Sequence, residues 1–434
     1  MRLSRLLLLL PWVISFLVIN VYSLRDQNAE NCRLFGECDA IADSLPEFSE
    51  NIENEPVINK ITFKIPHQRS YSSNQNEIQW AQTKVEELFN RTEPLILENM
   101  SEFDKNRQAP SNFWAAHTLS TPAAREKSFP ALVALLATKR IAKSKNVIPN
   151  ELDPQLEAIC PRDTVQYCEN RKYRTFDGSC NNIANPMWGA TYSPMQRFID
   201  ADYGDGISAL RASKHSKQDL PNVRYLSTVL FREPFVKQDQ LTTLVPHFAQ
   251  FIFNDMVHIA SVQLTDGGGE KQIPIPCCHS GVHGLRHPEC ASIRIPKNDK
   301  RLSDFVDCMP YPRTITAARE GCPLGPREQA NSATSFLDAS TIYGSTKQKA
   351  KQLRAFRNGQ LLTTSKASFG DIFPTTIDPI KTTFSSICAP SAGHSCFFSG
   401  SEHVNFLPTS AALHTIWIRQ HNNIANQLLV RKKL

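Results

Sequence analysis

The sequence lacks the features that mark several common protein classes. After residue 21 no run is long and apolar enough to cross a bilayer, so we expect no stable membrane span once the N-terminal segment is removed. No compact basic run is interleaved with aromatic residues, and 48 basic against 42 acidic residues leave a net charge of only +6. This balance argues against a nucleic-acid-binding protein. Internal repeats, low-complexity tracts and Cys-x-x-Cys pairs are also missing.

The N-terminus has the pattern of a targeting segment. Residues 1–23 contain two early arginines, an apolar run over Leu6–Val21 and small residues that match a cleavage site. This pattern predicts a secretory signal peptide, with a signal anchor as the alternative. We therefore expect a secreted, extracellular protein. Asn90-Arg91-Thr92 and Asn99-Met100-Ser101 are glycosylation sequons,, so we also expect it to be a glycoprotein.

The cysteines fit an oxidising compartment. Their number is twelve, and it is even, which favours disulfides over metal sites or redox catalysis. Cys277 and Cys278 are adjacent, so we expect them to pair outward with different partners, such as Cys290, Cys308 or Cys322.

Changes in composition divide the rest of the chain into two parts. Residues 24–150 begin with a polar, acidic stretch and continue with helical apolar spacing over Gln75–Leu97 and Pro130–Ala142, which predicts a pro-segment or accessory region. Residues 151–434 are rich in proline, glycine, aromatics and cysteine. They predict a mainly α domain whose helices are joined by long, disulfide-tied loops.

One stretch of that domain, Leu244–Leu264, is apolar around nearly the whole helical circumference, which predicts a buried helix. His247, Gln250, Asn254 and His258 recur on it at helical spacing and form one polar stripe,. Such a stripe faces either a hydrogen-bonded core network, the commoner case, or a polar cavity.

A second stretch, Thr334–Ser340, predicts a cation site. In an extended loop Thr334, Phe336, Asp338 and Ser340 point the same way,. Hydroxyl, carboxylate and backbone carbonyl oxygens suit Ca²⁺. The alternative is an ordinary Ser/Thr-rich turn.

Several motifs, in this order, resemble the animal haem peroxidases, the group of peroxidasin, myeloperoxidase and thyroid peroxidase. They are Lys172–Asn182, Asn185–Ala190, Tyr203–Gly206, Cys277-Cys278, His287–Cys290, Cys308-Met309, Arg327–Asn331, Thr334–Ser345 and Leu413–Ala425. The resemblance covers Cys160 to the end. It implies the animal haem-peroxidase fold, incomplete at the C-terminus, and oxidation of small reductants by hydrogen peroxide at haem b in a response to oxidative stress.

The resemblance also implies site residues, several of which are substituted. In the family the Thr334–Ser340 loop binds calcium together with the aspartate that is Asp255 here. The helix before it reads Gln-Phe-Leu-Asp-His-Asp in relatives and Gln250–Asp255 here, so Asn254 replaces the proton-transferring histidine and Phe253 replaces a haem-esterifying aspartate. An amide cannot accept and return a proton near neutral pH.

The second catalytic motif departs in the same direction. After Cys396–Gly400, His403 stands at the position of the family's peroxide-polarising arginine and Phe406 at that of its second ester-forming glutamate. The family's axial iron ligand lies on a helix beyond the last residue here, while His414 and His421 match structural positions. From the resemblance we therefore expect haem b to be held weakly, if at all.

These substitutions favour a degenerate, catalytically impaired homologue, a pseudo-enzyme that acts as an extracellular binding or defence protein with protein partners. One alternative is an active peroxidase or a catalase-like enzyme, in which His258 or His403 replaces the lost base. Another is a truncated product without function.

Overall fold

The computed structural model describes residues 74–100, 122–160, 168, 173–213, 219–231, 242–265, 272–278, 287–366, 370–377 and 396–432. All of them belong to one compact unit, Tyr71–Leu434. The expected signal peptide lies outside the described residues. No helix in the described part of the chain is both long and apolar enough to span a membrane.

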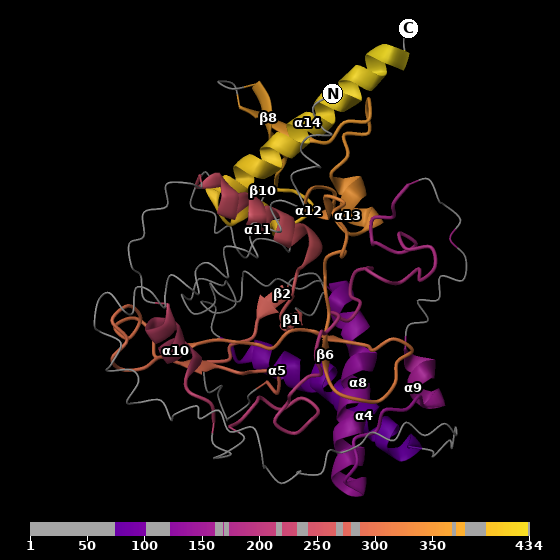
Figure 1. The fold of residues 1–434 in the computed structure, drawn as a ribbon, viewed down its shortest axis with the longest axis vertical. Helices are drawn as coiled ribbons and strands as arrows, with labels where there is room; N and C mark the ends of the chain where they lie inside the picture. Colours follow the sequence, from indigo (N-terminus) through magenta and orange to yellow (C-terminus); the bar gives the residue numbers. More distant parts are fainter. Residues whose placement is uncertain are drawn as a thin grey trace, which may run out of the picture. The chain divides into compact units, whose positions relative to one another are not determined.

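The unit is mainly helical, as predicted. Its helices are α4 (Gln75–Glu87), the π-helix η1 (Leu88–Thr92), α5 (Glu93–Glu98), α8 (Pro122–Lys145), α9 (Pro154–Ile159), α10 (Val223–Leu230), α11 (Leu244–Met256), α12 (Ser340–Tyr343), α13 (Lys347–Gln352), the 3₁₀-helix η4 (Glu402–Asn405) and α14 (Pro408–Lys432). Figure 1 shows α11 beside the first part of α14, with α12 and α13 close by.

The strands are short and form five two-stranded antiparallel pairs among the described residues. They are β1 (Gln263–Thr265) with β2 (Gln272–Pro274), β3 (Ile293–Arg294) with β4 (Cys308–Met309), β5 (Thr316–Ala317) with β6 (Glu328–Gln329), β7 (Thr363–Lys366) with β8 (Gly370–Pro374), and β9 (Thr376–Ile377) with β10 (Cys396–Phe397). Loops therefore make up much of the chain between helices.

The helices α4 and α8 pack against each other and against the domain that follows them. Ile78, Ala81 and Val85 recur along one face of α4 and are buried in a cluster that also contains Leu156 and Leu324. The sequence segment expected to be accessory thus shares a hydrophobic core with residues beyond position 151.

Disulfides connect these loops. Cys277 pairs with Cys290 and Cys278 with Cys308, which confirms that the adjacent cysteines have different partners. Cys322 pairs instead with Cys160.

The central helix is shorter and less buried than its sequence predicted. α11 ends at Met256, and Val257 is already extended. The Asn331 side chain explains the end, because it donates to the carbonyl of Met256 at 2.8 Å and accepts from the backbone N–H of His258 at 2.9 Å.

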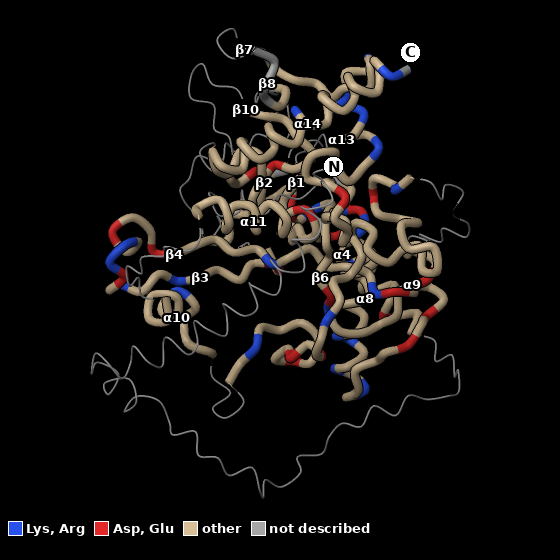
Figure 2. Tube along the Cα trace, turned by 45° about the horizontal axis from the view of Figure 1, so that its top comes forward, with Lys and Arg blue, Asp and Glu red and all other residues tan. Residues whose placement is uncertain are grey.

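The burial predicted all round this helix is also wrong, because Leu244 and Phe253 are more than half exposed. Only Phe251 and Asp255 on α11 are buried. Asp255 is the one charged residue of α11, which is otherwise drawn as uncharged in Figure 2. The polar contacts of this helix therefore concentrate at its C-terminal end.

Candidate functional site

A small cavity with polar and apolar lining residues lies between α11, η4 and the start of α14. It is lined by His247, Gln250, Phe251, Asn254, His403, Phe406, Leu407, Thr409 and Ser410. Gln250, Asn254, His403 and Phe406, all predicted as site residues, thus come together. The cavity has room for about one water molecule, about 10 Å³,.

The polar stripe of α11 divides between this cavity and a separate location. His247 shares a hydrogen bond of 3.1 Å between its Nδ1 and Thr409 Oγ1, and Asn254 is half-buried at the cavity wall. The predicted alignment of His258 with this stripe is wrong, because the helix ends two residues earlier. Only the first three members of the stripe therefore line this cavity.

The substituted aromatic positions differ in environment. Phe406 lines the cavity, and its ring centroid is 4.6 Å from that of His403. Phe253 is 56% exposed and does not belong to the cavity wall formed by the described residues.

His403 is held at the cavity wall by the turn that carries it. Ser401 caps η4, and its Oγ lies 2.6 Å from His403 Nδ1. The carbonyl of His403 accepts a hydrogen bond from Ser410 Oγ at 2.5 Å. These contacts fix both the backbone and the ring of a residue that is only 7% exposed.

His258 lies against His403, a contact that sequence reasoning missed. The two ring centroids are 5.2 Å apart, with the ring planes at 72°. Burial lowers the pKa of His258 to about 4, and its Nε2 is buried without a hydrogen-bond partner among the described residues. No sequence pattern signalled this pair, because it depends on where α11 ends.

A cluster of oxygen atoms lies at the C-terminal end of α11. Asp255, buried at 4% exposure, accepts hydrogen bonds from the backbone N–H groups of Ala339 and Thr341 at 3.0 and 3.1 Å. Ser340 Oγ donates to the Asp255 carbonyl at 3.1 Å. These bonds fix the register between α11 and the loop before α12.

The other members of the predicted calcium set lie in that loop. Thr334 Oγ1 donates to Asp338 Oδ2 at 2.8 Å and is 3.5 Å from the carbonyl oxygen of Phe336. The expectation of a fully extended segment is wrong at its end, because Ala339 is left-handed (φ 59°) and Ser340 begins α12. The turn nevertheless brings both Asp338 and Asp255 to Ser340.

The electrostatics of this cluster suit a cation. Burial raises the pKa of Asp255, and the negative charge of Asp338 adds to the rise. Within the described ranges, no group of three His, Cys, Asp or Glu side chains is placed to hold a metal. A cation here would depend on these two carboxylates together with hydroxyl and carbonyl oxygens, a donor set that fits Ca²⁺.

Two other histidines, both on α14, have structural partners. His414 is 1% exposed and contacts the Ser410 carbonyl through Nδ1 at 2.8 Å and Thr341 Oγ1 through Nε2 at 3.2 Å. His421 lies 2.9 Å from the Tyr343 hydroxyl. Both rings tie α14 to its neighbours.

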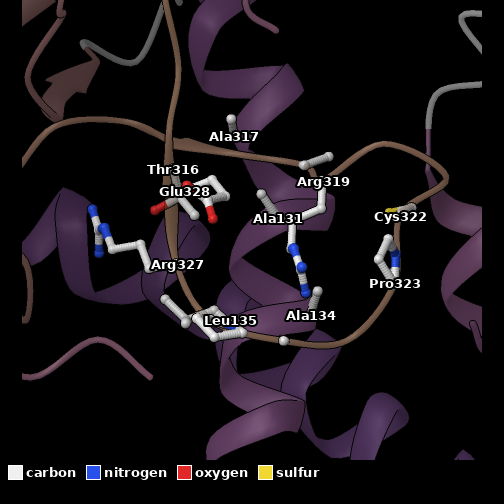
Figure 3. Close-up of a pocket in the computed structure, with 13 residues that line it drawn as sticks. Ala131, Ala134, Leu135, Thr316, Ala317, Arg319, Cys322, Pro323, Arg327 and Glu328 are labelled. Carbon is white, nitrogen blue, oxygen red and sulfur yellow. The ribbon is translucent and has the colours of Figure 1, made fainter. Parts of the chain in front are cut away.

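A further cavity lies between α8 and the segment Thr316–Glu328 (Figure 3). Small side chains such as Ala131 and Ala134 form part of its wall. The Arg319 guanidinium enters it and donates to Asn150 and to the Leu324 carbonyl. Because it also has room for about one water molecule,, we assign it to packing.

Comparisons with known proteins identify similar sequences. A sequence profile described as animal haem peroxidase matches residues 173–433. The chain is 31% identical over 287 residues to mouse peroxidasin homolog, covering 60% of this chain and 18% of that protein.

Two further relatives are equally similar. Chorion peroxidase of Aedes aegypti is 31% identical over 303 residues, covering 67% of this chain and 37% of that protein. Dog thyroid peroxidase is 31% identical over 313 residues, with coverage of 66% and 31%. The chain thus spans between 18% and 37% of the length of these relatives. Among solved structures, peroxidase A from Dictyostelium discoideum is similar with a TM-score of 0.42 and 19% identity, over 59% of this chain and 46% of that chain.

Proposed function

Because the chain belongs to the animal haem peroxidase family, we propose that it is a secreted member whose peroxide-cleaving site is impaired. In this proposal it acts as an extracellular binding or defence protein. The family implies a haem cofactor, with hydrogen peroxide and a reductant as substrates. The observation that carries the proposal is the amide of Asn254 at the wall of the cavity between α11, η4 and α14.

The register of α11 supports assigning Asn254 to the family's base position. The residue after it, Asp255, is anchored to Ala339 and Thr341 by backbone hydrogen bonds. This anchor supports our assignment of Asn254 to the place where the resemblance puts a proton-transferring histidine. A positioned acid/base contributes about 10²–10⁴ in rate, and an amide cannot supply it.

The position of His403 supports the same conclusion. Its Nδ1 is engaged by Ser401, so it offers at most one ring nitrogen to the cavity. The guanidinium that it replaces would present a fork of donors to peroxide. Polarisation of peroxide is therefore weaker than in relatives.

The described residues do not fit a tightly held haem. The cavity between α11 and η4 admits about one water molecule, about 10 Å³,. Phe253 and Phe406, at the two ester positions, have no carboxylate to form a link. We therefore propose no reaction step through haem.

The oxygen cluster supports a calcium site in the same protein. Asp255 and Asp338 supply charge, and Thr334, Ser340 and the carbonyl of Phe336 supply neutral oxygens. A divalent cation would offset the unfavourable burial of the Asp255 carboxylate, whose pKa burial raises. Its role would be to hold the end of α11 against the start of α12.

Peroxide turnover tests the impaired site. The 434-residue chain, expressed in animal cells and supplied with haem, is assayed for Soret absorbance and for consumption of hydrogen peroxide. We expect weak haem retention and turnover about 10²–10⁴ below that of a family member with an intact distal histidine. Tight, stoichiometric haem with family-like turnover would overturn the proposal.

Two variants test whether the amide at position 254 causes the low peroxide turnover. Asn254→His restores a proton acceptor, whereas Asn254→Gln keeps an amide and serves as the matched control. A rise in turnover for the first variant alone supports the proposal. Equal and substantial turnover in the parent and both variants would place the base elsewhere, as in the alternative of an active enzyme that uses His258 or His403.

Secretion has a separate test. The culture medium should contain a protein whose sequence begins near Leu24. It should carry a glycan at Asn90, an exposed residue, and a glycosidase should remove the mass of that glycan. The Asn90→Gln variant should lack that mass. Retention of the whole product inside the cell, with residues 1–23 uncleaved, would contradict secretion.

A further inference from the structure

The contact between His258 and His403 is built from two separately anchored segments. The backbone N–H of His258 donates to Asn331 Oδ1 at 2.9 Å, and its carbonyl accepts from the Ser332 N–H at 2.8 Å. Asn331 also holds the preceding turn through the carbonyl of Met256. The backbone position of His258 is therefore fixed at both of its polar groups.

His403 is fixed as firmly from the other side. Ser401 Oγ lies 2.6 Å from its Nδ1 and also accepts from its backbone N–H at 3.3 Å, while Ser410 Oγ donates to its carbonyl. With Nδ1 engaged, Nε2 is the nitrogen through which this ring would bind a ligand. A hydrogen bond at one ring nitrogen, which orients the other toward an ion, is characteristic of histidine metal ligands.

The spacing of the rings matches two imidazoles on one ion. Histidine nitrogens bind Zn²⁺ at about 2.0–2.1 Å, and near-tetrahedral angles then place two ring centres roughly 5 Å apart. The observed centroid distance is 5.2 Å. Simple edge-to-face packing gives similar distances, so the state of the ring nitrogens must distinguish the two.

His258 Nε2 provides that distinction. It is buried and has no hydrogen-bond partner among the described residues, although an unsatisfied buried polar atom costs about 1–3 kcal/mol. Contact with the His403 ring alone does not satisfy this nitrogen. A metal ion bound at Nε2 removes this cost.

From these observations we propose that His258 and His403 together bind a divalent transition-metal ion of the zinc and copper class. Imidazole suits these ions, whereas the oxygen cluster around Asp255 suits calcium. No group of three His, Cys, Asp or Glu ligands occurs in the described part of the chain, so water molecules would complete the coordination. Of the two histidines, His403 lines the cavity that Asn254 also lines, whereas His258 is not part of that wall.

This site is independent of the proposed loss of peroxidase activity, because it requires neither haem nor the calcium loop. It would add metal binding by His258 and His403 to this part of the protein. Two imidazoles and one or more waters would bind Zn²⁺ reversibly.

Zn²⁺ binding to the full chain tests the proposal. Protein freed of transition metals and kept in calcium is titrated with Zn²⁺ by calorimetry. We expect one site per chain, weakened at least about tenfold in His258→Gln and in His403→Gln, since even outer contacts of a metal site affect affinity about 10–100-fold. His421→Gln, which removes a histidine of α14 bonded to Tyr343, is the matched control and should keep the site.

A measurement on the unmutated chain guards against misfolded variants. Adding Zn²⁺ should shift the imidazole ¹⁵N resonances of His258 and His403 together and at one equivalent. Absence of a saturable shift, or Zn²⁺ binding that survives in both variants, would overturn the proposal. Shifts confined to other histidines, such as His421, would do the same.

Discussion

His414 makes the stability of the protein sensitive to acid. Its ring lies in the core between the Ser410 carbonyl and Thr341 Oγ1, and burial lowers its pKa from 6.5 to about 4. The unfolded chain binds a proton at this residue below pH 6.5, whereas the folded protein does not until near pH 4. The contribution of neutral His414 to stability is therefore complete above pH 6.5 and is lost as the pH falls toward 4.

The size of this effect follows from the shift. Each pKa unit corresponds to about 1.4 kcal/mol, and linkage between values of 6.5 and 4 gives a loss of about 2 kcal/mol between pH 7.5 and pH 5. His414→Gln keeps an amide that can donate to Ser410 and accept from Thr341 but does not titrate. Its free energy of unfolding should therefore fall by about 2 kcal/mol less than that of the parent over this range.

Urea unfolding, followed by tryptophan fluorescence with disulfides intact, measures the difference. Ile418→Val is the control on the same helix, because Ile418 is 3% exposed and its truncation costs about 1 kcal/mol at every pH. If His414→Gln keeps the full acid sensitivity of the parent, or if NMR places the pKa of His414 near 6.5, the reasoning is wrong.

Three further predictions concern other buried groups. Burial lowers the pKa of Lys349 to about 8, so the folded state binds fewer protons than the unfolded chain between pH 8 and 10.5. The free energy of unfolding of the parent should therefore rise by about 2 kcal/mol from pH 7.5 to 9.5. Urea unfolding of Lys349→Met should not show that rise. Glu93 forms a buried ion pair with Arg125, so Glu93→Gln should lower the free energy of unfolding by about 3 kcal/mol, while the exposed Glu98→Gln on the same helix should change it little. Removing Ca²⁺ with a chelator should lower the melting temperature of the parent but leave that of Asp338→Asn unchanged; equal shifts in both proteins would contradict a calcium site at this loop.

Motif order and cysteine spacing predicted the family and the helical class, because these depend on residue identity along the chain. The divergent pairing of Cys277 and Cys278 was predicted for the same reason, since adjacent cysteines are poorly placed to bridge each other. Gln250, Asn254 and His403 were identified from motif positions, and the fold brings them to one cavity.

The sequence failed where a distant side chain decides the local structure. Apolar periodicity continues to Leu264, yet the helix ends at Met256 because Asn331 takes over the backbone groups on both sides of Val257. The periodicity of a segment contains no information about a hydrogen-bonding side chain, such as Asn331, that lies far along the chain. The exposure of Leu244 and Phe253 was missed for a related reason, because burial depends on which neighbours cover each face.

Residue identity alone therefore determined that position 254 carries an amide and position 403 an imidazole, since chemical type is a property of each side chain. Only the tertiary structure decided that His258 meets His403, that His414 is buried neutral, and that Asp255 and Asp338 converge on Ser340. Distances, desolvation and charge interactions between segments arise when the chain closes on itself, and no linear spacing contains them.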